Sequence, residues 1–206
     1  MKKKRRYLEC SLDDYLKELS GRSIVPGGGS VSALTAALGA GLNLMVLNYS
    51  IGKKRNAGRG DIIAARKKQR RSLGKLSGLV DRDCKAFSAL MKALSVGRNA
   101  QGRYKTAAAV PMDICRECHV SMDITAFLLK KGNKNLVTDV GCAADILKAA
   151  FDSALLNVKV NLREISDRRF VKKTEKALAV LKKGIGGHYA KISREVEKVM
   201  GKRAAR

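Results

Sequence analysis

Hydrophobic residues recur along this chain at the three- and four-residue spacing that places them on one face of a helix. Strict alternation of apolar and polar residues, which half-buried strands require, is rare. The breaks between the periodic runs are short and rich in glycine, lysine and asparagine. The pattern predicts six helices, at residues 8–20, 30–51, 61–95, 103–131, 138–164 and 167–200.

Long helices joined by short connections pack as antiparallel neighbours. The predicted fold class is therefore all-α, an antiparallel bundle of about six helices. A chain of 206 residues has the usual length of one domain, so residues 1–206 are predicted to form a single helical domain. The glycines in residues 184–188 are expected to kink or interrupt the last helix.

Residues 31–51 differ from the other runs because they are apolar on every side and carry no charge. The stretch is long enough to span a bilayer, yet serine, threonine and asparagine interrupt it and no second span exists. We therefore favour the central, small-residue-rich helix of a bundle, surrounded by protein rather than lipid. The row Ala33, Ala37 and Gly41 would let another helix approach closely, in the same chain or in a second subunit.

The turn before this helix contains three consecutive glycines, Gly27, Gly28 and Gly29, followed by Ser30. Such a turn exposes backbone N–H groups at a helix N-terminus, where anions and polar ligands bind. A tight turn that only starts the helix explains the same residues. The turn alone does not decide between the two interpretations.

The charge is strongly unbalanced, with 43 Lys and Arg against 18 Asp and Glu, a net charge of +25. So large a charge attracts polyanions, which makes nucleic acid one class of partner. The cations are spread over every segment, however, and no aromatic residues lie among them to stack bases. A solvated basic surface explains the pattern better, and nucleic acid is disfavoured as the main partner.

No targeting or cofactor signal is complete. The basic N-terminus lacks the apolar stretch of a signal peptide, and five cysteines, an odd number, indicate free thiols in a cytoplasmic protein. Cys115, Cys118 and His119 have the spacing of a c-type haem attachment, but that attachment requires export. A zinc site would need a fourth ligand. We predict neither a metal nor another cofactor.

Residues 73–94 give the sharpest signal for a single functional residue. On a helical wheel Asp83 falls near the middle of the apolar face, whereas Asp81 points nearly the opposite way, toward solvent. A carboxyl group among apolar side chains is costly unless it is used or hydrogen-bonded. Burial would raise its pKa, so that it could donate a proton near neutral pH. An aspartate that is hydrogen-bonded to a neighbouring helix is the structural alternative.

A second polar pattern lies in residues 138–164, where Asp139, Asn157 and Asn161 fall on the apolar face. At a rise of 1.5 Å per residue, Asp139 and Asn157 are about 27 Å apart. They cannot share one small site within one subunit. Either they serve different sites, or one of them is structural, or a second chain contributes.

Six sequence segments occur in an order that resembles a known family. They are PGGGSVSALTAALGAGLNLMV, IGKK, LVDRDCKAF, VPMDI, GNKNLVTDVGCAA and LNVKVNL. Together they resemble the cyclodeaminase/cyclohydrolase family over roughly residues 8–180. This family includes the cyclodeaminase domain of formiminotransferase-cyclodeaminase and stand-alone methenyltetrahydrofolate cyclohydrolases.

The resemblance implies an all-helical, cytoplasmic enzyme, at least dimeric, that acts on folates without a metal. Asp83 is the second acid of the family's D-x-D-x-x-A-F element, which supplies the proton donor. Other motif positions would border the folate or scaffold the site: Gly27, Gly28, Gly29, Ser30, Lys53, Lys54, Asn135 and Asp139.

The expected activity is that of a formiminotetrahydrofolate cyclodeaminase, which closes the ring to 5,10-methenyltetrahydrofolate and releases ammonia with Asp83 as general acid. Methenyltetrahydrofolate cyclohydrolase is the alternative, because it uses the same five-membered ring. A non-enzymatic, basic, RNA-binding helical protein is the further alternative. The expected partners are a folate, with or without a polyglutamate tail, and a second copy of the chain.

Overall fold

A computed structural model describes residues 6–51, 58–97 and 99–204, and in this part of the chain every regular element is a helix. The all-α prediction is confirmed. In chain order the elements are η1 (Tyr7–Glu9), α1 (Leu12–Ser20), α2 (Gly28–Ser50), α3 (Arg59–Ser95), α4 (Gln101–Lys131), η2 (Lys134–Leu136), α5 (Val137–Arg163) and α6 (Arg168–Ala204).

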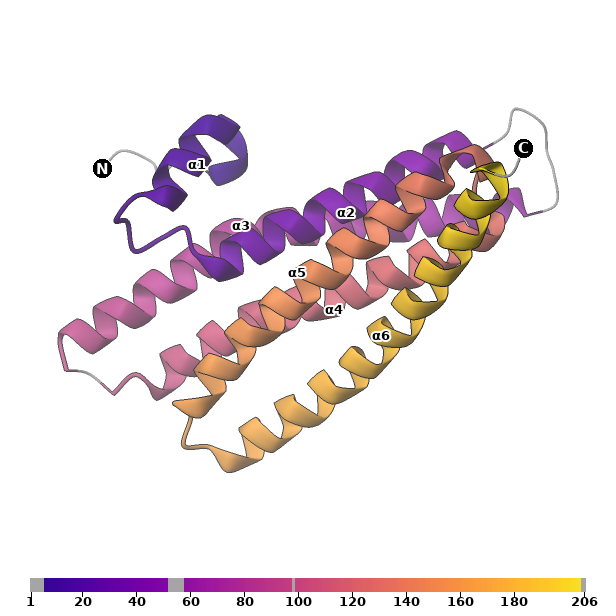
Figure 1. Cartoon of the computed structure of the whole chain (residues 1–206). Coiled ribbons are helices and arrows are strands. Elements are labelled where there is room, and N and C mark those ends of the chain that lie inside the picture. Colours follow the sequence, from indigo (N-terminus) through magenta and orange to yellow (C-terminus); the bar gives the residue numbers. More distant parts are fainter. Residues whose placement is uncertain (1–5, 52–57, 98, 205–206) are drawn as a thin grey trace.

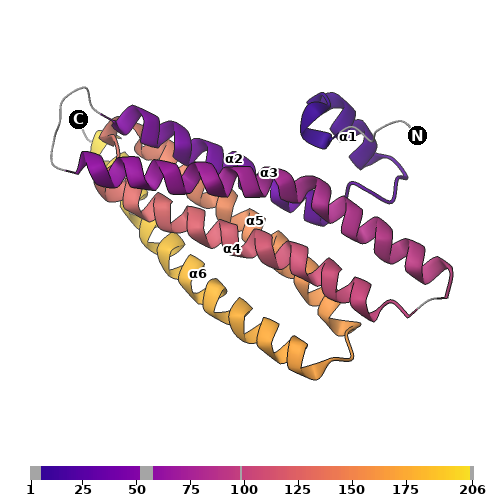
Figure 2. The same cartoon turned by 180° about the vertical axis from the view of Figure 1, so that it is seen from behind.

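The five long helices form an antiparallel bundle, and α1 lies to one side of it, beside the N-terminal end of α2 (Figure 1). Helix α2 packs against α3, α4 and α5. Helix α4 also contacts α6, so that α4 lies between α3 and α6 on the opposite face (Figure 2). The bundle arrangement predicted from the short connections is confirmed.

The first helix begins later than its apolar pattern indicated. Tyr7–Glu9 forms a short 3-10 turn, and Ser11 then caps α1 by accepting a hydrogen bond from the backbone N–H of Asp14 at 3.0 Å. The predicted start at residue 8 was therefore wrong by four residues, because a capping serine outweighs continued apolar spacing.

The glycines of residues 184–188 do not interrupt the last helix, because α6 runs without a break from Arg168 to Ala204. A Cβ at Gly184 would lie 2.3 Å from Nε2 of His119. The glycine therefore lets α6 approach α4 closely. Tertiary packing, which propensity does not describe, explains its presence.

Helix α2 is long and apolar enough to cross a membrane by composition, but 56% of its most apolar window is buried inside the bundle. The core helix of a bundle meets the same criterion. A Cβ at Gly39 would lie 2.8 Å from Cγ of Leu147, which shows how closely α2 and α5 pack. Gly41, in contrast, faces open space.

A layer of polar side chains crosses the middle of the bundle. Asn43 on α2 donates hydrogen bonds to the Ser121 carbonyl oxygen and to Oγ1 of Thr125, both at 2.9 Å. Gln69 and Ser72 on α3 reach Oγ of Ser121 at 3.2 and 3.1 Å. No side chain of this buried polar layer is more than 1% exposed. Every residue in it is bonded to another, as buried polar groups require.

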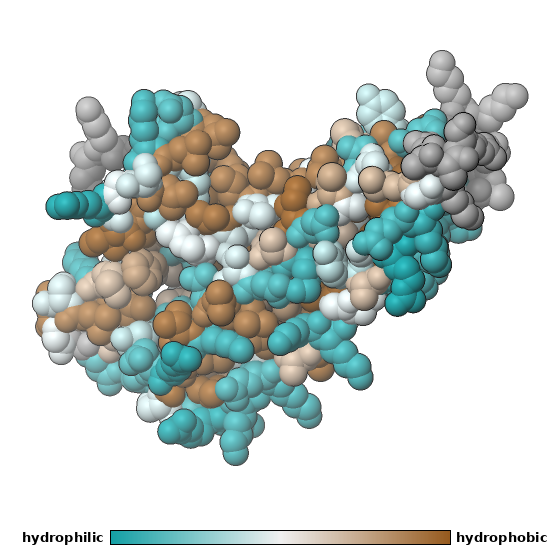
Figure 3. All heavy atoms as spheres, viewed as in Figure 1, coloured by the Kyte–Doolittle hydropathy of each residue, from teal (hydrophilic) through white to brown (hydrophobic). Residues whose placement is uncertain are grey.

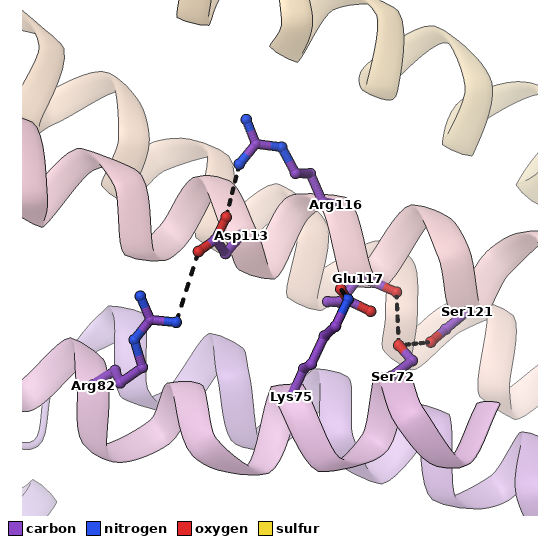
Figure 4. A network of polar contacts seen from close by, with 7 residues as sticks. All are labelled: Ser72, Lys75, Arg82, Asp113, Arg116, Glu117 and Ser121. Atoms are coloured by element: carbon purple, nitrogen blue, oxygen red, sulfur yellow. Dashed lines mark hydrogen bonds and ion pairs between the residues drawn. The ribbon is translucent and has the colours of Figure 1, made fainter. Parts of the chain in front are cut away.

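Outside this layer, ion pairs join α3 to α4 along the surface (Figure 4). Asp113 is 2.7 Å from Arg116 on its own helix and 3.8 Å from Arg82 on α3, and Lys75 on α3 is 2.6 Å from Glu117. The exposed pairs of Asp113 contribute little to stability, whereas Glu117 is buried with 8% exposure. The contact between Lys75 and Glu117 therefore adds to the buried layer and the apolar core in holding the two helices together.

Candidate active site

A cavity of about 240 Å³ opens at the N-terminal end of α2, where α3, α4 and α5 come together. Asp83 is the acid that α3 contributes to its wall, and the glycine turn forms another part of the wall. The residues around it are Ile24, Val25, Gly27, Gly28, Gly29, Asp83, Ala86, Phe87, Leu90, Met91, Tyr104, Ala107, Asn157, Val160, Asn161 and Glu164.

The Asp83 carboxyl group lies directly against the glycine turn. A Cβ placed on Gly29 would be 2.1 Å from Oδ1 of Asp83 and 2.6 Å from Oδ2. No side chain fits in that space, so the absence of a Cβ lets the acid reach the backbone. The backbone N–H of Ser30 donates a hydrogen bond to Asp83. The turn and the acid, which the sequence analysis identified separately, therefore form one site.

Burial raises the pKa of Asp83 from 3.8 to about 6, although the hydrogen bond from the Ser30 N–H works in the opposite direction. At pH 7 about a tenth of the molecules would keep the proton on this carboxyl group. Asp83 is thus poised to give or take a proton near neutral pH, which is what general acid–base catalysis requires.

Two amides on α5, those of Asn157 and Asn161, line the same cavity as Asp83, and neither was among the site residues predicted from the sequence. Nδ2 of Asn157 donates to the Ser153 carbonyl oxygen at 2.9 Å, and Nδ2 of Asn161 donates to the Asn157 carbonyl oxygen at 2.7 Å. Neither Oδ1 atom accepts a hydrogen bond from the residues that the structure describes. Two polar residues spaced four apart on an apolar face were the available signal.

Apart from Tyr104 and Glu164, the rest of the wall is apolar. Leu90 and Val25 are buried, while Ile24 and Val160 at the rim are 65% and 55% exposed. A wall of this composition suits a flat ring system, with the amides and the carboxyl group supplying the few polar contacts that orient it.

The predicted site residues divide into two groups by position. Gly27, Gly28 and Gly29 line the cavity, and Ser30 lies behind the acid with 0% exposure. Lys53 and Lys54 lie outside the residues that the structure describes.

The second group lies at the other end of the bundle. Asn135 belongs to η2 and Asp139 to the first turn of α5. The backbone N–H of Asn133 donates to Oγ of Ser50 at 2.9 Å, which ties this region to the C-terminal end of α2. Since α2 has 23 residues and is about 33 Å long, one chain does not bring Asn135 or Asp139 to Asp83.

Asp81 does not point to solvent as its wheel position indicated, and that prediction was wrong. Its side chain is only 13% exposed. Oδ1 accepts a hydrogen bond from the backbone N–H of Tyr7 at 3.1 Å, and Nε of Arg6 is 3.7 Å from Oδ2. The residues before α2 cover this face of α3, which a wheel of α3 alone cannot show.

The cysteines of the haem-like motif are packing residues of α4. Cys115 and Cys118 are both 0% exposed, and burial raises the pKa of the Cys115 thiol to about 12. Within residues 6–51, 58–97 and 99–204, no group of three or more His, Cys, Asp and Glu is arranged to hold a metal ion.

Comparison with known proteins gives consistent results. Residues 11–180 match the model of the formiminotransferase-cyclodeaminase family. A methenyltetrahydrofolate cyclohydrolase from Methylorubrum extorquens is 33% identical over 82% of this chain and 86% of its own length. A formimidoyltransferase-cyclodeaminase from Gallus gallus is 30% identical over 82% of this chain, but the match covers only 34% of that longer protein.

A solved structure is similar as well. The crystal structure of formiminotetrahydrofolate cyclodeaminase from Thermotoga maritima superposes with a TM-score of 0.89 at 30% sequence identity. The match covers 94% of this chain and 98% of that one.

Proposed function

Because this chain belongs to the formiminotransferase-cyclodeaminase family, an enzyme family of folate one-carbon chemistry, we propose that it is a formiminotetrahydrofolate cyclodeaminase. The substrate would be 5-formiminotetrahydrofolate, and the products 5,10-methenyltetrahydrofolate and ammonia. The observation that carries the proposal is the protonatable carboxyl group of Asp83 at the wall of the cavity.

The reaction needs a proton at one nitrogen. N10 of the folate attacks the formimino carbon held on N5, and as the five-membered ring closes N10 loses its proton while the imine nitrogen gains one. The resulting amino group leaves as ammonia only when it accepts a further proton, because amide ion is a very poor leaving group. Asp83 in its protonated form would supply that proton, a contribution of typically ~10²–10⁴-fold in rate.

The size of the cavity fits part of the substrate. A volume of about 240 Å³ is below the ~300–1,000 Å³ of most small-molecule sites, so it would take a bicyclic ring rather than a whole folate. A ring that fills it would exclude water from Asp83 and raise the carboxyl pKa further. Holding N10 near the formimino carbon adds an orientation effect, since both belong to one molecule.

Methenyltetrahydrofolate cyclohydrolase activity is the second candidate, and the relative from Methylorubrum extorquens favours it. In that reaction water adds to the methenyl carbon and the ring opens at a nitrogen. With a pKa of about 6, most Asp83 carboxyls are ionised at pH 7, so the same group could take a proton from the attacking water.

One assay separates the two reactions. The absorbance of the methenyl group is followed after purified enzyme is added either to 5-formiminotetrahydrofolate or to 5,10-methenyltetrahydrofolate. The proposal predicts that absorbance appears with the first substrate, with ammonia released in equal amount. Faster loss of absorbance with the second substrate would assign the cyclohydrolase instead. If neither signal changes while RNA binds tightly at moderate salt, the protein is an RNA binder.

The proposal includes a homodimer, and an apolar face supports it. Helix α2 has no charged residue, and α5 has three acidic and three basic ones. On these neighbouring helices Leu38, Tyr49, Leu156 and Val160 are 55–69% exposed. Figure 3 shows apolar residues gathered over α1 and the adjoining part of the bundle. Exposed apolar surface of this kind marks protein interfaces.

A two-fold dimer built on this face would also explain why the predicted site residues lie at opposite ends of one chain. If α2 of one chain runs antiparallel to α2 of its partner, the end that holds Asn135 and Asp139 faces the Asp83 cavity of the other chain. The apolar rim formed by Ile24 and Val160 would then be covered. The partner would complete a site that one chain leaves open.

A mixing experiment tests the shared site. Asp83→Asn and Asp139→Ala dimers are each expected to be inactive. Exchange of subunits makes half of the dimers mixed, and each mixed dimer has one intact site, so about a quarter of the wild-type activity should return. Full activity of Asp139→Ala, or no recovery in dimers shown to have exchanged, would contradict the arrangement.

The same proposal places the enzyme in the cytoplasm and gives it no metal or other cofactor, because each step is a proton transfer or a ring closure within the substrate. A polyglutamate tail would find Lys92 and Arg103 in a second cavity at the same ends of α3 and α4. Its negative charges would be attracted there.

A further inference from the structure

The N-terminal segment, residues 7–20, has an unusual position for part of a small helical protein. It comprises η1 and α1 and lies beside the bundle rather than within it (Figure 1). Most of its side chains are exposed, including Leu12 at 67% and Leu16 at 51%. Tyr7 and Tyr15 are its buried residues, at 7% and 5% exposure. Two tyrosines therefore attach this segment.

The outer end of the segment is held by Asp81 of α3. Oδ1 of Asp81 accepts a hydrogen bond from the backbone N–H of Tyr7 at 3.1 Å, and Oδ2 is 3.7 Å from Nε of Arg6. The edge of the Tyr7 ring then packs on the Tyr15 ring, with the ring centroids 5.4 Å apart at an interplanar angle of 88°. The Asp81 contact thus fixes the tyrosine that packs against Tyr15.

The inner end of the segment returns to the active site. The hydroxyl group of Tyr15 and Oγ of Ser30 share a hydrogen bond of 3.2 Å, and the backbone N–H of Ser30 donates to Asp83. The contacts therefore form a chain that begins at Asp81 on α3, runs through Tyr7, Tyr15 and Ser30, and ends at Asp83, two residues further along α3. Tyr15 and Ser30 do not line the cavity, so they lie behind the acid.

We propose that Tyr15 and Asp81 are positioning residues for Asp83, which act through Ser30 and the N-terminal segment. Tyr15 closes the side of Asp83 that faces away from the cavity and fixes the Ser30 hydroxyl group. Asp81 holds the segment on α3 so that Tyr15 stays in place. The catalytic consequence rests on the proposed function of Asp83 as general acid, whereas the effect on its titration does not.

The physical reason is the number of donors that reach the carboxylate. When the Ser30 hydroxyl group donates its proton to the Tyr15 oxygen, Ser30 gives Asp83 only its backbone N–H. If the Tyr15 hydroxyl is removed, the Ser30 hydroxyl is free to rotate toward the carboxylate and donate as well. A second donor to the ionised form lowers the pKa of the acid.

Other titratable groups near Asp83 do not change the expected effect of Tyr15 and Asp81 on its pKa. Tyr104 from α4 and Glu164 from α5 share its cavity, and Cys84 is the next residue on α3. The end of α2 at the cavity has no titratable side chain. None of these groups belongs to the N-terminal segment, so Tyr15→Phe and Asp81→Ala remove none of them.

The first test compares two matched substitutions in the chain of 206 residues, Tyr15→Phe and Tyr7→Phe. Each removes one buried tyrosine hydroxyl group from the same segment and keeps the ring. The carboxyl group of Asp83 is titrated by carbon NMR in each protein. Tyr15→Phe is expected to lower the Asp83 pKa by about one unit and kcat about tenfold, with little change in KM. Tyr7→Phe loses only a bond to Glu18 and should match the wild type.

The second test addresses Asp81. Asp81→Asn keeps an oxygen that can accept the Tyr7 N–H, and Asp81→Ala does not. The alanine variant should lower the pKa and kcat as Tyr15→Phe does, and should expose residues 7–20 to limited proteolysis. The asparagine variant should stay near the wild type. Adding Asp81→Ala to Tyr15→Phe should give little further loss in kcat, since both act through one contact.

The outcomes separate this inference from the proposed function. Unchanged Asp83 titration in both Tyr15→Phe and Asp81→Ala would overturn the inference, even if Asp83 proves catalytic. A shifted titration without any turnover of either folate would leave the positioning role intact and refute the proposed function. A loss of activity in Asp81→Asn equal to that in Asp81→Ala would show that Asp81 does not act by accepting the hydrogen bond of the Tyr7 N–H.

Discussion

The buried polar layer and the Asp83 site contain polar side chains of the same helix, α3, in the same bundle, yet they are built in opposite ways. In the buried polar layer, Gln69 and Ser72 form hydrogen bonds with partners from α2 and α4. Asp83 has the Ser30 N–H on one side and a cavity of about 240 Å³ on the other.

The comparison teaches how to separate a structural polar group from a functional one. A buried amide or hydroxyl with all its partners in the protein contributes to stability and to the uniqueness of the core. A carboxyl group with few donors and a raised pKa is a cost to the fold. The cavity beside it is where a substrate could exchange a proton with that carboxyl group.

The largest expected effect is that of Asp83→Asn. Asparagine keeps the size of the side chain and removes the proton donor, so kcat for the proposed reaction should fall at least ~100-fold. Folate binding and the circular dichroism spectrum should be unchanged. Near-normal kcat in this variant would show that the cavity carboxyl is as structural as the buried polar layer.

Gly29→Ala should have the next largest effect. The new Cβ would lie 2.1 Å from Oδ1 of Asp83, so the acid or the turn must move, and kcat should fall by about 10–100-fold. Gly27→Ala is the matched control, because a Cβ there meets nothing within 4 Å. Steady-state kinetics of the two variants measures the difference. Equal losses of kcat would show that any substitution in the turn lowers activity, and that the close approach of Asp83 to Gly29 has no special role.

A substitution in the buried polar layer should lower the stability of the protein and leave kcat unchanged. Asn43→Ala removes one hydrogen-bond partner each from buried groups of Gln69, Ser121 and Thr125, and should lower the free energy of unfolding by about 2 kcal/mol. Asn48→Ala, at an exposed position of the same helix, should change it by less than about 0.5 kcal/mol. Urea unfolding measures both. The kcat per folded molecule should stay at the wild-type value, and a fall would mean that the two regions are coupled.

Much of the fold and part of the site could be predicted from the sequence. Helical periodicity and short connections gave the bundle, since both depend on local spacing. The wheel placed Asp83 among apolar residues, and the structure puts it in a partly buried wall beside Leu90. The glycine turn was recognised as a candidate ligand site, but nothing in the spacing showed that it would meet Asp83.

What escaped prediction depends on contacts between distant segments. Asp81 was placed in solvent because a single-helix wheel omits the N-terminal segment that covers it. The glycines of residues 184–188 were expected to kink or interrupt a helix, but α6 is continuous and Gly184 makes room for His119. Asn135 and Asp139 matched family motifs, while their distance from the cavity depends on the length and direction of α2.

The most direct test of the central claim, that burial holds a proton on Asp83, compares the stability of the wild type and Asp83→Asn between pH 4 and pH 8. A folded-state pKa of about 6, against 3.8 when unfolded, stabilises the protein below pH 3.8, and this stabilisation is lost as the pH rises through about 6. Asparagine does not titrate. Relative to the wild type, Asp83→Asn should therefore gain about 2 kcal/mol in free energy of unfolding between pH 4 and pH 8. A difference that stays constant over this range would contradict the claim.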